Sequence, residues 1–306
     1  MDSIRVHAPA TVANVVCGFD CLGFALAEPY DEIVVRKIDE PVIRISHLDD
    51  FGLPTDPERN VAGVALRAML DLIDAEFGFE VEITKNIKPG SGIGSSSASS
   101  SGAVVAADHL LGGRFSKLEL VNFAMEGEKL ASGARHADNV APCIFGGFTL
   151  VRSTDSLDIV SLKFPPLFAV VIHPQIEIKT AEARAVLPKE VQLRDAVKQW
   201  SNVGSLVAAL AAGDLKLLAR SMEDHIVEPA RRSLIPNFDE VKEASLAAGA
   251  LGGGISGSGP SIFMLCESDE VAEDVLDAMV EAYDPTGIDF QIHVGEISPS
   301  GVRLAE

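Results

Sequence analysis

Residues 88–98 read Lys88-Pro89-Gly90-Ser91-Gly92-Ile93-Gly94-Ser95-Ser96-Ser97-Ala98. The alternating glycines permit a left-handed backbone and let the main chain approach a ligand closely. Residues 97–111 are small and mostly apolar, which predicts a buried helix that ends at the glycine pair 112–113. A helix that begins near Ser95 and Ser96 presents free N–H groups and the positive end of its dipole, which attract phosphate. Serine hydroxyls there can cap the helix, bind phosphate oxygens or ligate Mg²⁺.

This segment differs from the two commonest phosphate-binding loops. No lysine follows its last glycine in the way that a Walker A loop requires, and its glycines follow G-x-G-x-G rather than the dinucleotide pattern G-x-G-x-x-G. A flexible glycine-serine linker is the remaining alternative. However, an alternating strand pattern at 79–83 precedes the segment and an apolar helix follows it at once, which favours an ordered loop.

Composition and charge exclude several classes of protein. With 306 residues, 47% hydrophobic and 23% charged, the chain is long and apolar enough for one large domain or two modest ones. Its formal net charge of −20 argues against nucleic-acid and anionic-membrane partners. We expect neither a membrane helix, which needs about 20 apolar residues, nor a signal peptide. Four scattered cysteines argue against a disulfide scaffold or a zinc site and favour a reducing cytoplasm.

Strand patterns dominate the first half of the chain and helical patterns the second. We expect strands at 4–8, 33–37, 42–46, 79–83, 146–152, 168–172, 261–266 and 288–295, and a glycine-rich turn at 252–259. Helices are expected at 60–76, 180–187, 190–211, 214–227, 237–248 and 269–283, and at 117–130 behind a capping box that starts at Ser116. This order predicts the α+β class, with a soft boundary in 153–166 that separates domains 1–158 and 159–306.

Residues 89–98 resemble the phosphate loop of the GHMP kinases, the superfamily of galactokinase, homoserine kinase and mevalonate kinase. Two further stretches resemble the homoserine kinase family within it. One is Pro9-Ala10-Thr11, followed by Asn14 and by Gly18-Phe19-Asp20-Cys21-Leu22-Gly23; the other is Gly127-Glu128, followed by His136-Ala137-Asp138-Asn139-Val140-Ala141-Pro142 and Gly146-Gly147. Taken alone, Asn14 and Asp20 could be turn formers and Glu128 a solvated helix residue.

A last glycine-rich run, residues 252–261, resembles the C-terminal motif of the same superfamily, which borders the substrate site. The run matches G-x-G-x-x-G, but a predicted helix rather than a strand precedes it, so a Rossmann assignment fails. The resemblance spans essentially the whole chain. It implies an N-terminal part like ribosomal protein S5 domain 2 and a ferredoxin-like C-terminal part. The implied activity is ATP-dependent phosphorylation of the side-chain hydroxyl of L-homoserine, in threonine biosynthesis, and a homodimer is compatible with it.

The resemblance also assigns roles to individual residues. ATP would be bound by Lys88, Pro89, Gly90, Ser91, Gly92, Ile93, Gly94, Ser95, Ser96, Ser97 and Ala98, and Mg²⁺ by Ser96 and Glu128. Catalytic roles fall to Asn139, Glu128, Thr180 and Arg184, and substrate binding to Asn14, Asp20, His136, Asp138, Asn139, Arg184, Arg232 and Gly257.

Homoserine is a zwitterion, so its site needs both cations and anions. Arg184 and Arg232 are the choices for its carboxylate, because a guanidinium can bind a carboxylate through two hydrogen bonds; Arg231 is the fallback for Arg232. Asp20 and Asp138 are the choices for its ammonium, and Asp138 could instead act as a base.

Two other functions stay open on sequence alone. The first is a GHMP kinase with a different alcohol acceptor, such as mevalonate, because the phosphate loop is shared. The second is a non-catalytic protein of this fold that binds a metabolite, since fold alone does not settle function. The presence of both Ser96 and Glu128 argues against the second.

Overall fold

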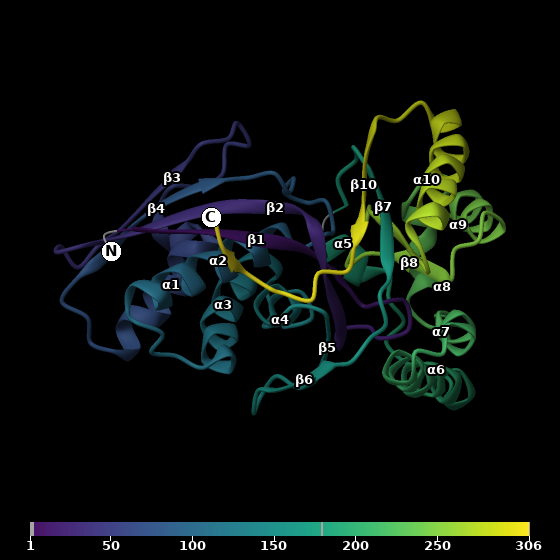
Figure 1. Ribbon diagram of the computed structural model, residues 1–306, viewed down its shortest axis with the longest axis horizontal. Coiled ribbons are helices and arrows are strands. Elements are labelled where there is room, and N and C mark those ends of the chain that lie inside the picture. Colours follow the sequence, from purple (N-terminus) through teal and green to yellow (C-terminus); the bar gives the residue numbers. More distant parts are fainter. Residues whose placement is uncertain (1–2, 179, 306) are drawn as a thin grey trace.

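The computed structural model describes residues 3–178 and 180–305 and contains two antiparallel-rich sheets with helices packed on them (Figure 1). The first half is built from β1 Ser3–Ala13, β2 Leu22–Ile38, β3 Ile43–His47, α1 Val61–Leu72, β4 Gly78–Thr84, α2 Ser95–Leu110, α3 Lys117–Ser132, α4 Val140–Phe145, β5 Phe148–Ser153 and β6 Asp158–Leu162. The second half contains β7 Phe168–Pro174, α5 Thr180–Ala185, α6 Leu193–Ala212, α7 Leu215–Ser221, α8 Glu228–Arg231, α9 Phe238–Ala247, β8 Gly252–Ile255, β9 Ile262–Cys266, α10 Asp269–Tyr283, β10 Phe290–Glu296 and β11 Arg303–Leu304. Short 3₁₀ turns lie at Pro57–Arg59, Arg232–Leu234 and Asp284–Thr286.

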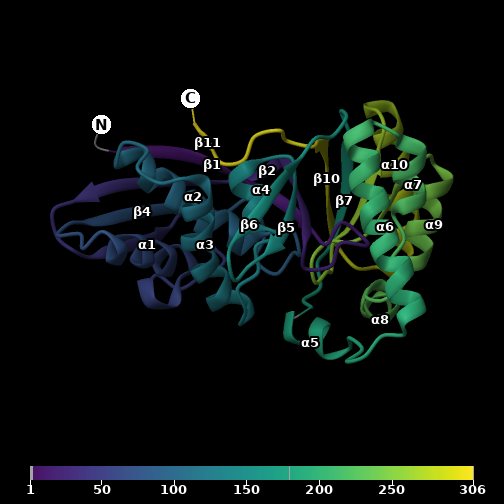
Figure 2. The ribbon, with the colours of Figure 1, turned by 90° about the horizontal axis from the view of Figure 1, so that it is seen from below.

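The first sheet has the order β11-β1-β2-β4-β3, and the β5–β6 hairpin joins it through β2. Its strands are antiparallel apart from the β3–β4 pair. Helices α1, α2 and α3 lie together on one face of this sheet (Figures 1 and 2). Apolar residues of β1, β2 and β4 alternate with polar ones, so one face of each strand joins the core beneath the helices.

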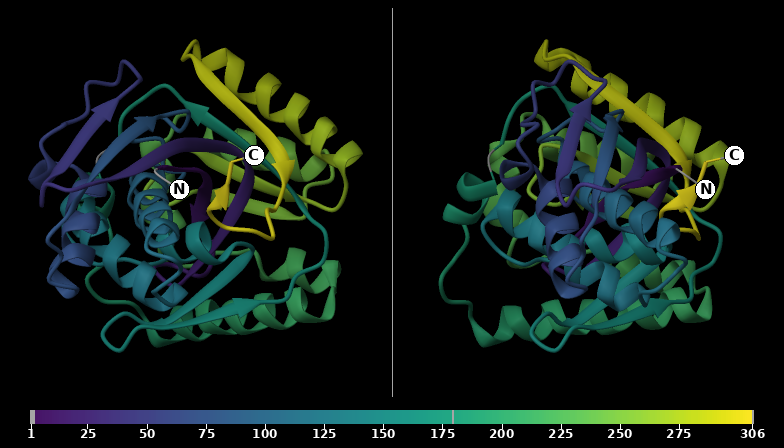
Figure 3. Two further views of the ribbon diagram at one scale, coloured as in Figure 1. Left: turned by 60° about the vertical axis from the view of Figure 1, so that its left-hand side comes forward. Right: turned by 90° about the vertical axis from the view of Figure 1, so that its left-hand side faces the viewer.

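The second sheet has the order β10-β7-β9-β8 and is antiparallel throughout its described strands. A second core lies between this sheet and helices α9 and α10. Figure 3 shows α10 in yellow and α6 in green on opposite sides of this half. After β10 the chain returns to the first sheet, where β11 pairs with β1.

Most predicted elements are confirmed, including the capping box of Ser116 and Glu119 at the start of α3. Together with the order of strands and helices, this confirms the predicted α+β class. No helix among residues 3–178 and 180–305 is long and apolar enough to cross a bilayer.

Several predicted elements differ from the structure, among them the strand expected at 33–37, which begins at Leu22 as β2. Strand β1 continues to Ala13, so the polar loop begins only at Asn14; the long pairing with β2 extends it beyond the apolar run. Residues 252–255 form strand β8, because they pair with β9, and only residues 256–259 form the turn. The helix expected over 214–227 ends at Ser221, where Asp224 caps the next segment instead. The domain boundary at 158/159 stays a prediction, and the β5–β6 hairpin crosses it.

Candidate active site

A cavity of about 740 Å³ opens between the two halves of the chain. Its walls come from the glycine-rich loop before α2, the loop after β1, the end of α3 with the stretch that leads to α4, the stretch 53–61 before and at the start of α1, Lys85 after β4, and the part of the second half that carries Arg184, Arg231 and the turn after β8. The residues that line it include Asn14, Phe19, Asp20, Lys85, Pro89, Gly90, Gly92, Gly94, Ser95, Ser96, Glu128, His136, Asp138, Asn139, Arg184, Arg231 and Gly257.

The glycine-rich loop reaches the cavity through its backbone. Gly90, Gly92 and Gly94 have φ angles of +76°, +84° and +72°. A Cβ on Gly94 would lie 2.1 Å from Thr11 Oγ1, so glycine is required there for close packing as well as for its φ. Helix α2 begins at Ser95, as predicted, and no side chain of the described residues caps it. Its first N–H groups are therefore available to an anion.

Only part of the predicted nucleotide-binding set faces the cavity. Pro89, Gly90, Gly92, Gly94, Ser95 and Ser96 line it, whereas Lys88, Ser91, Ile93, Ser97 and Ala98 do not. The apolar Ile93 and Ala98 belong to the core. Lys88 Nζ donates a hydrogen bond to Gln175, and the Ser91 carbonyl accepts one from the Ser261 hydroxyl. These five residues therefore lie away from the cavity and support the loop.

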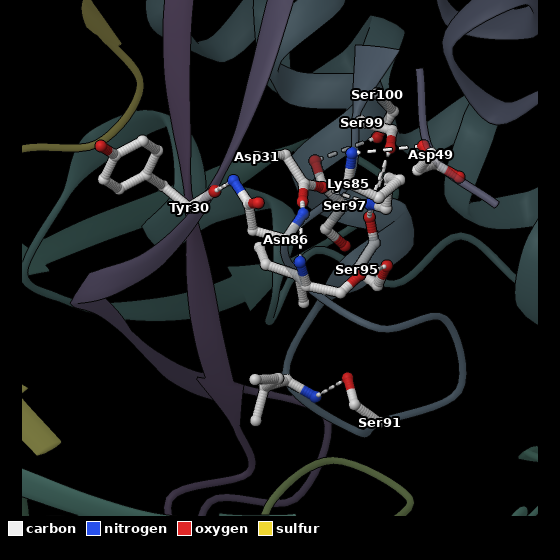
Figure 4. A network of polar contacts seen from close by, with 12 residues as sticks. Tyr30, Asp31, Asp49, Lys85, Asn86, Ser91, Ser95, Ser97, Ser99 and Ser100 are labelled. Carbon is white, nitrogen blue, oxygen red and sulfur yellow. Dashed lines mark hydrogen bonds and ion pairs between the residues drawn. The ribbon is translucent and has the colours of Figure 1, made fainter. Parts of the chain in front are cut away.

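A buried ion pair, which the sequence analysis missed, supports the first turn of α2 (Figure 4). Lys85, just after β4, pairs with Asp31 of β2, and their side chains are 1% and 0% exposed. Lys85 Nζ also donates to the Ser95 carbonyl at 2.7 Å and to Ser99 Oγ at 3.0 Å. Asp31 Oδ1 accepts the N–H groups of residues 86 and 87. Asp31 lies within the long strand β2 and Lys85 directly after β4, and neither belongs to a motif that the sequence analysis identified.

Glu128 of α3 lies beside the start of α2. Its Oε2 accepts hydrogen bonds from Ser96 Oγ at 3.0 Å and from Ser97 Oγ at 3.1 Å. Burial raises the pKa of Glu128, and the serine hydrogen bonds and the nearby charge of Arg184 oppose that rise. A carboxylate and a hydroxyl oxygen next to a phosphate loop are suitable Mg²⁺ ligands.

The loop after β1 has an unusual backbone. Asn14, Val15 and Val16 have φ angles of 72°, 42° and 61°, a left-handed turn that costs about 1–2 kcal/mol per non-glycine residue. Inside it, Asn14 Oδ1 accepts the N–H of Asp20 at 3.0 Å, and Asn14 Nδ2 donates to the Gly257 carbonyl at 2.8 Å. The turn therefore links two predicted substrate residues to the loop after β8.

Arg184 of α5 binds Asp20 through both of its terminal nitrogens, with the shortest contact 3.0 Å from Arg184 Nη2 to Asp20 Oδ1. Arg184 Nη2 also donates to His136 Nε2 at 2.8 Å. Burial lowers the pKa of His136, the nearby Arg184 lowers it further and Asp20 opposes them, so a neutral imidazole suits this accepting role. The two predicted substrate groups, one cation and one anion, thus bind each other directly at the cavity, and a zwitterion that used both would have to separate them.

The structure places Arg231, and not Arg232, at the cavity, so the position of Arg232 does not support its assignment to the carboxylate. Arg232 points away from the cavity and pairs with Asp239 at 3.1 Å, where both side chains are more than half exposed. Arg231 is buried, lines the cavity, and donates to the carbonyls of Ala183 at 2.8 Å and Gly257 at 3.0 Å. Successive residues on a helix point about 100° apart, so only one of the two arginines can face inward.

Phe19 lies against both inward arginines. Its ring centroid is 5.6 Å from the Arg184 guanidinium carbon and 5.2 Å from that of Arg231, distances that allow cation–π contact. In the sequence, Phe19 stands within the Gly18–Gly23 motif, and nothing there signals its contact with the arginines.

Asp138 and Asn139 lie at the start of α4. Burial, together with the charges of Asp20 and Glu128, raises the pKa of Asp138 to about 7. Asn139 Oδ1 accepts a hydrogen bond from Thr11 Oγ at 2.7 Å. Lys179 and the side chain of Thr180 lie outside the described residues, so the role of Thr180 stays a prediction.

Comparison with known proteins gives matches along the chain. The pattern of the GHMP kinases N terminal domain matches residues 60–147, and that of the GHMP kinases C terminal domain matches residues 206–285. The homoserine kinase of Chloroherpeton thalassium is 44% identical over 318 residues, which cover 99% of this chain and 100% of that protein.

Solved structures agree with these matches. The crystal structure of homoserine kinase from Cytophaga hutchinsonii superposes with a TM-score of 0.96 at 50% identity and covers 100% of this chain and 98% of that one. The structure of L. major mevalonate kinase in complex with R-mevalonate has a TM-score of 0.70 at 19% identity, over 97% of this chain and 96% of that one. At that identity the second likeness concerns the fold alone.

Proposed function

This chain belongs to the homoserine kinase family of the GHMP kinases, and we propose that it transfers the γ-phosphoryl group of ATP to the side-chain hydroxyl of L-homoserine in threonine biosynthesis. The observation that carries this proposal is the pairing of Arg184 with Asp20, beside the buried Arg231, in the cavity that also holds the phosphate loop. One cavity therefore contains donors for phosphate and a matched set of charges for an amino acid.

ATP binding follows from the start of α2. The N–H groups that follow Gly94 receive phosphate oxygens, and the Ser96 hydroxyl and the Glu128 carboxylate hold Mg²⁺. Mg²⁺ held there would neutralise charge on the phosphates. Its charge would also favour the ionised form of Glu128.

The zwitterion is placed by opening the ion pair between Arg184 and Asp20. Arg184 and Arg231 bind the carboxylate, and the freed Asp20, with Asp138, binds the ammonium. The exchange keeps every charge paired, which matters because an unpaired buried charge is costly. The Ala183 and Gly257 carbonyls hold the Arg231 guanidinium in one orientation before substrate arrives.

Phosphoryl transfer needs positioning and charge stabilisation more than a strong base. Asn139 and His136 orient the substrate hydroxyl towards the γ-phosphorus. A new O–P bond forms there while the bond to the β,γ-bridging oxygen breaks, the hydroxyl proton passes to an oxygen of the transferred phosphoryl group and from there to solvent, and ADP leaves. We assign Asp138 to ammonium binding rather than to proton removal.

All four cysteines are free thiols among the described residues, which fits a reducing cytoplasm.

A kinase with another alcohol acceptor is the main alternative. An acceptor such as mevalonate carries a carboxylate but no ammonium, so Asp20 would be left with no cation once Arg184 moved to the substrate. That cost favours an amino acid over a simple hydroxy acid. A non-catalytic role is disfavoured because Ser96 and Glu128 remain together beside the phosphate loop.

The test is a coupled ADP-release assay with L-homoserine, L-serine and mevalonate as acceptors. Release with mevalonate but not with L-homoserine would reject the proposal. A matched pair of variants then probes the carboxylate site. Arg231→Lys should raise KM for homoserine about 10- to 100-fold, because an ammonium cannot reproduce the forked contacts, and Arg232→Lys should change it less than about twofold.

A further inference from the structure

The left-handed turn of residues 14–16 needs support from outside itself. Val15 and Val16 are buried, and β-branched residues rarely adopt positive φ angles. Within the loop, the Gly18 N–H donates to the Asn14 carbonyl at 2.8 Å, and the Asn14 N–H donates to the Leu22 carbonyl at 2.7 Å. These bonds close the turn, but they leave the Cys17 carbonyl to be satisfied from elsewhere.

That support comes from Gln199, a residue of α6 that lies 182 positions further along the chain. Gln199 Nε2 donates to the Cys17 carbonyl at 2.9 Å and to Asp224 Oδ1 at 2.9 Å. Its Oε1 accepts the N–H of His225 at 2.9 Å. Both amide donors and the amide acceptor are used, so rotating the amide by 180° would break all three hydrogen bonds.

Asp224 continues the connection towards the arginine side of the cavity. Its Oδ1 also accepts the N–H groups of Ile226 and Val227 at 2.9 and 3.0 Å, and its Oδ2 accepts that of Glu228 at 2.8 Å. Glu228 is the first residue of α8, whose last residue is Arg231. Gln199 therefore joins the loop after β1, which carries Asn14 and Asp20, to helix α8, which carries the buried Arg231.

We propose that Gln199 is a positioning residue that sets the spacing between the two charged sides of the homoserine site. This inference rests on the proposed function for its substrate. Gln199 does not line the cavity, so it acts through the Cys17 carbonyl on one side and through Asp224 on the other. Homoserine must span these two sides, whereas the phosphate loop has no contact with Gln199 among the described hydrogen bonds.

Two variants and one control test this role. Gln199→Ala removes all three hydrogen bonds. Gln199→Glu keeps the volume of the side chain and an acceptor for His225 but removes both donors. Asn202→Ala is the control, because Asn202 lies on the same helix and donates to the neighbouring Glu223 carbonyl at 2.9 Å without reaching the turn. Each variant is first checked for an unfolding transition close to that of the unmodified protein.

Both Gln199 variants lose at least two hydrogen bonds and should raise KM for homoserine about tenfold, while KM for ATP changes less than about twofold. Asn202→Ala should leave both constants unchanged. Hydrogen exchange gives a readout that needs no substrate: amides of residues 14–22 should exchange at least about tenfold faster in the Gln199 variants only.

The two measurements separate this inference from the proposed function. If the unmodified protein does not phosphorylate homoserine, the proposed function fails, and exchange alone still decides whether Gln199 holds the turn. An unchanged exchange rate in residues 14–22 overturns the inference. So does a KM for homoserine that stays at the level of the Asn202→Ala control, or a KM for ATP that rises equally.

Discussion

Replacing Lys85 by methionine should test how the phosphate loop is held. Methionine keeps most of the length of the side chain and removes only the charged donor. In the structure that donor contacts the Asp31 carboxylate, the Ser95 carbonyl and Ser99 Oγ, and the two charged side chains are 1% and 0% exposed. Lys85→Met therefore leaves a buried carboxylate whose remaining donors are the N–H groups of residues 86 and 87.

Removing one partner of a buried ion pair costs about 3–5 kcal/mol. The two remaining N–H donors hold the Asp31 carboxylate in part, so we expect a loss near the lower limit, about 3 kcal/mol. At about 2–4 °C per kcal/mol for a domain of this size, Tm should fall by about 6–12 °C. The double variant Lys85→Met/Asp31→Asn removes both charges and should recover part of that loss, because no uncompensated ion remains.

The loss of stability in Lys85→Met should also depend on pH. Burial raises the pKa of Asp31, and Lys85 opposes that rise. Without Lys85 the folded state binds a proton on Asp31 more tightly than the unfolded state does. The stabilisation that the variant gains from protonation of Asp31 is fully present below the pKa of Asp31 in the unfolded state. It is lost as pH rises through the pKa of Asp31 in the folded state. The deficit in Tm of Lys85→Met should thus be smaller at about pH 5 than at about pH 8.

Calorimetry at both pH values and initial rates by ADP release would measure these effects. KM for ATP should rise, because the first turn of α2 loses a donor to Ser95 and Ser99, while KM for homoserine should change little. A Tm within about 2 °C of the unmodified protein at pH 8 would refute the reasoning, since it would mean that the ion pair contributes almost nothing to stability.

Two other substitutions test the site itself. Gly94→Ala places a Cβ 2.1 Å from Thr11 Oγ1 at a φ of +72°, so initial rates should show a loss of kcat/KM of at least about 100-fold, and a rate near normal would contradict the packing argument. The pKa of Asp138 is about 7, so its carboxylate forms as pH rises through neutrality, and KM for homoserine should fall over the same range. Asp138→Asn should raise that KM and abolish its change with pH; a loss of several decades in kcat at unchanged KM would instead indicate a base.

The parts of the fold that the sequence predicted correctly depend on local signals. The start of α2 was read from glycines that are followed at once by serines and an apolar run, and the start of α3 from the Ser116–Glu119 capping box, since each signal lies within one turn of the helix. Strand β8 was missed because three glycines carry no strand pattern. They become a strand only through pairing with β9, which lies further along the chain.

In the candidate site too, local motifs identified some residues, whereas those whose placement depends on packing or on strand register could not be predicted. The motifs found Asn14, Asp20, His136, Asp138 and Arg184, all of which line the cavity. Sequence alone could not decide between Arg231 and Arg232, because the phase of a four-residue helix is set by what packs around it. Nor could it pair Asp31 with Lys85 across 54 positions, since that contact depends on the register of β2 against β4.

The net charge of −20 does not oppose the binding of an anionic nucleotide, because the cavity sets its own field. At physiological salt, interactions between exposed charges fade beyond about 8 Å, so most surface carboxylates contribute little inside the cavity. Within it, Arg184 and Arg231 are balanced by Asp20 and by the partly protonated Asp138, and the phosphate loop offers N–H groups rather than lysines. Backbone donors bind phosphate without adding a cation that would compete with Mg²⁺ for Glu128. An acidic surface and a site for anions therefore coexist because the anion site is built from backbone dipoles and from the guanidinium groups of Arg184 and Arg231.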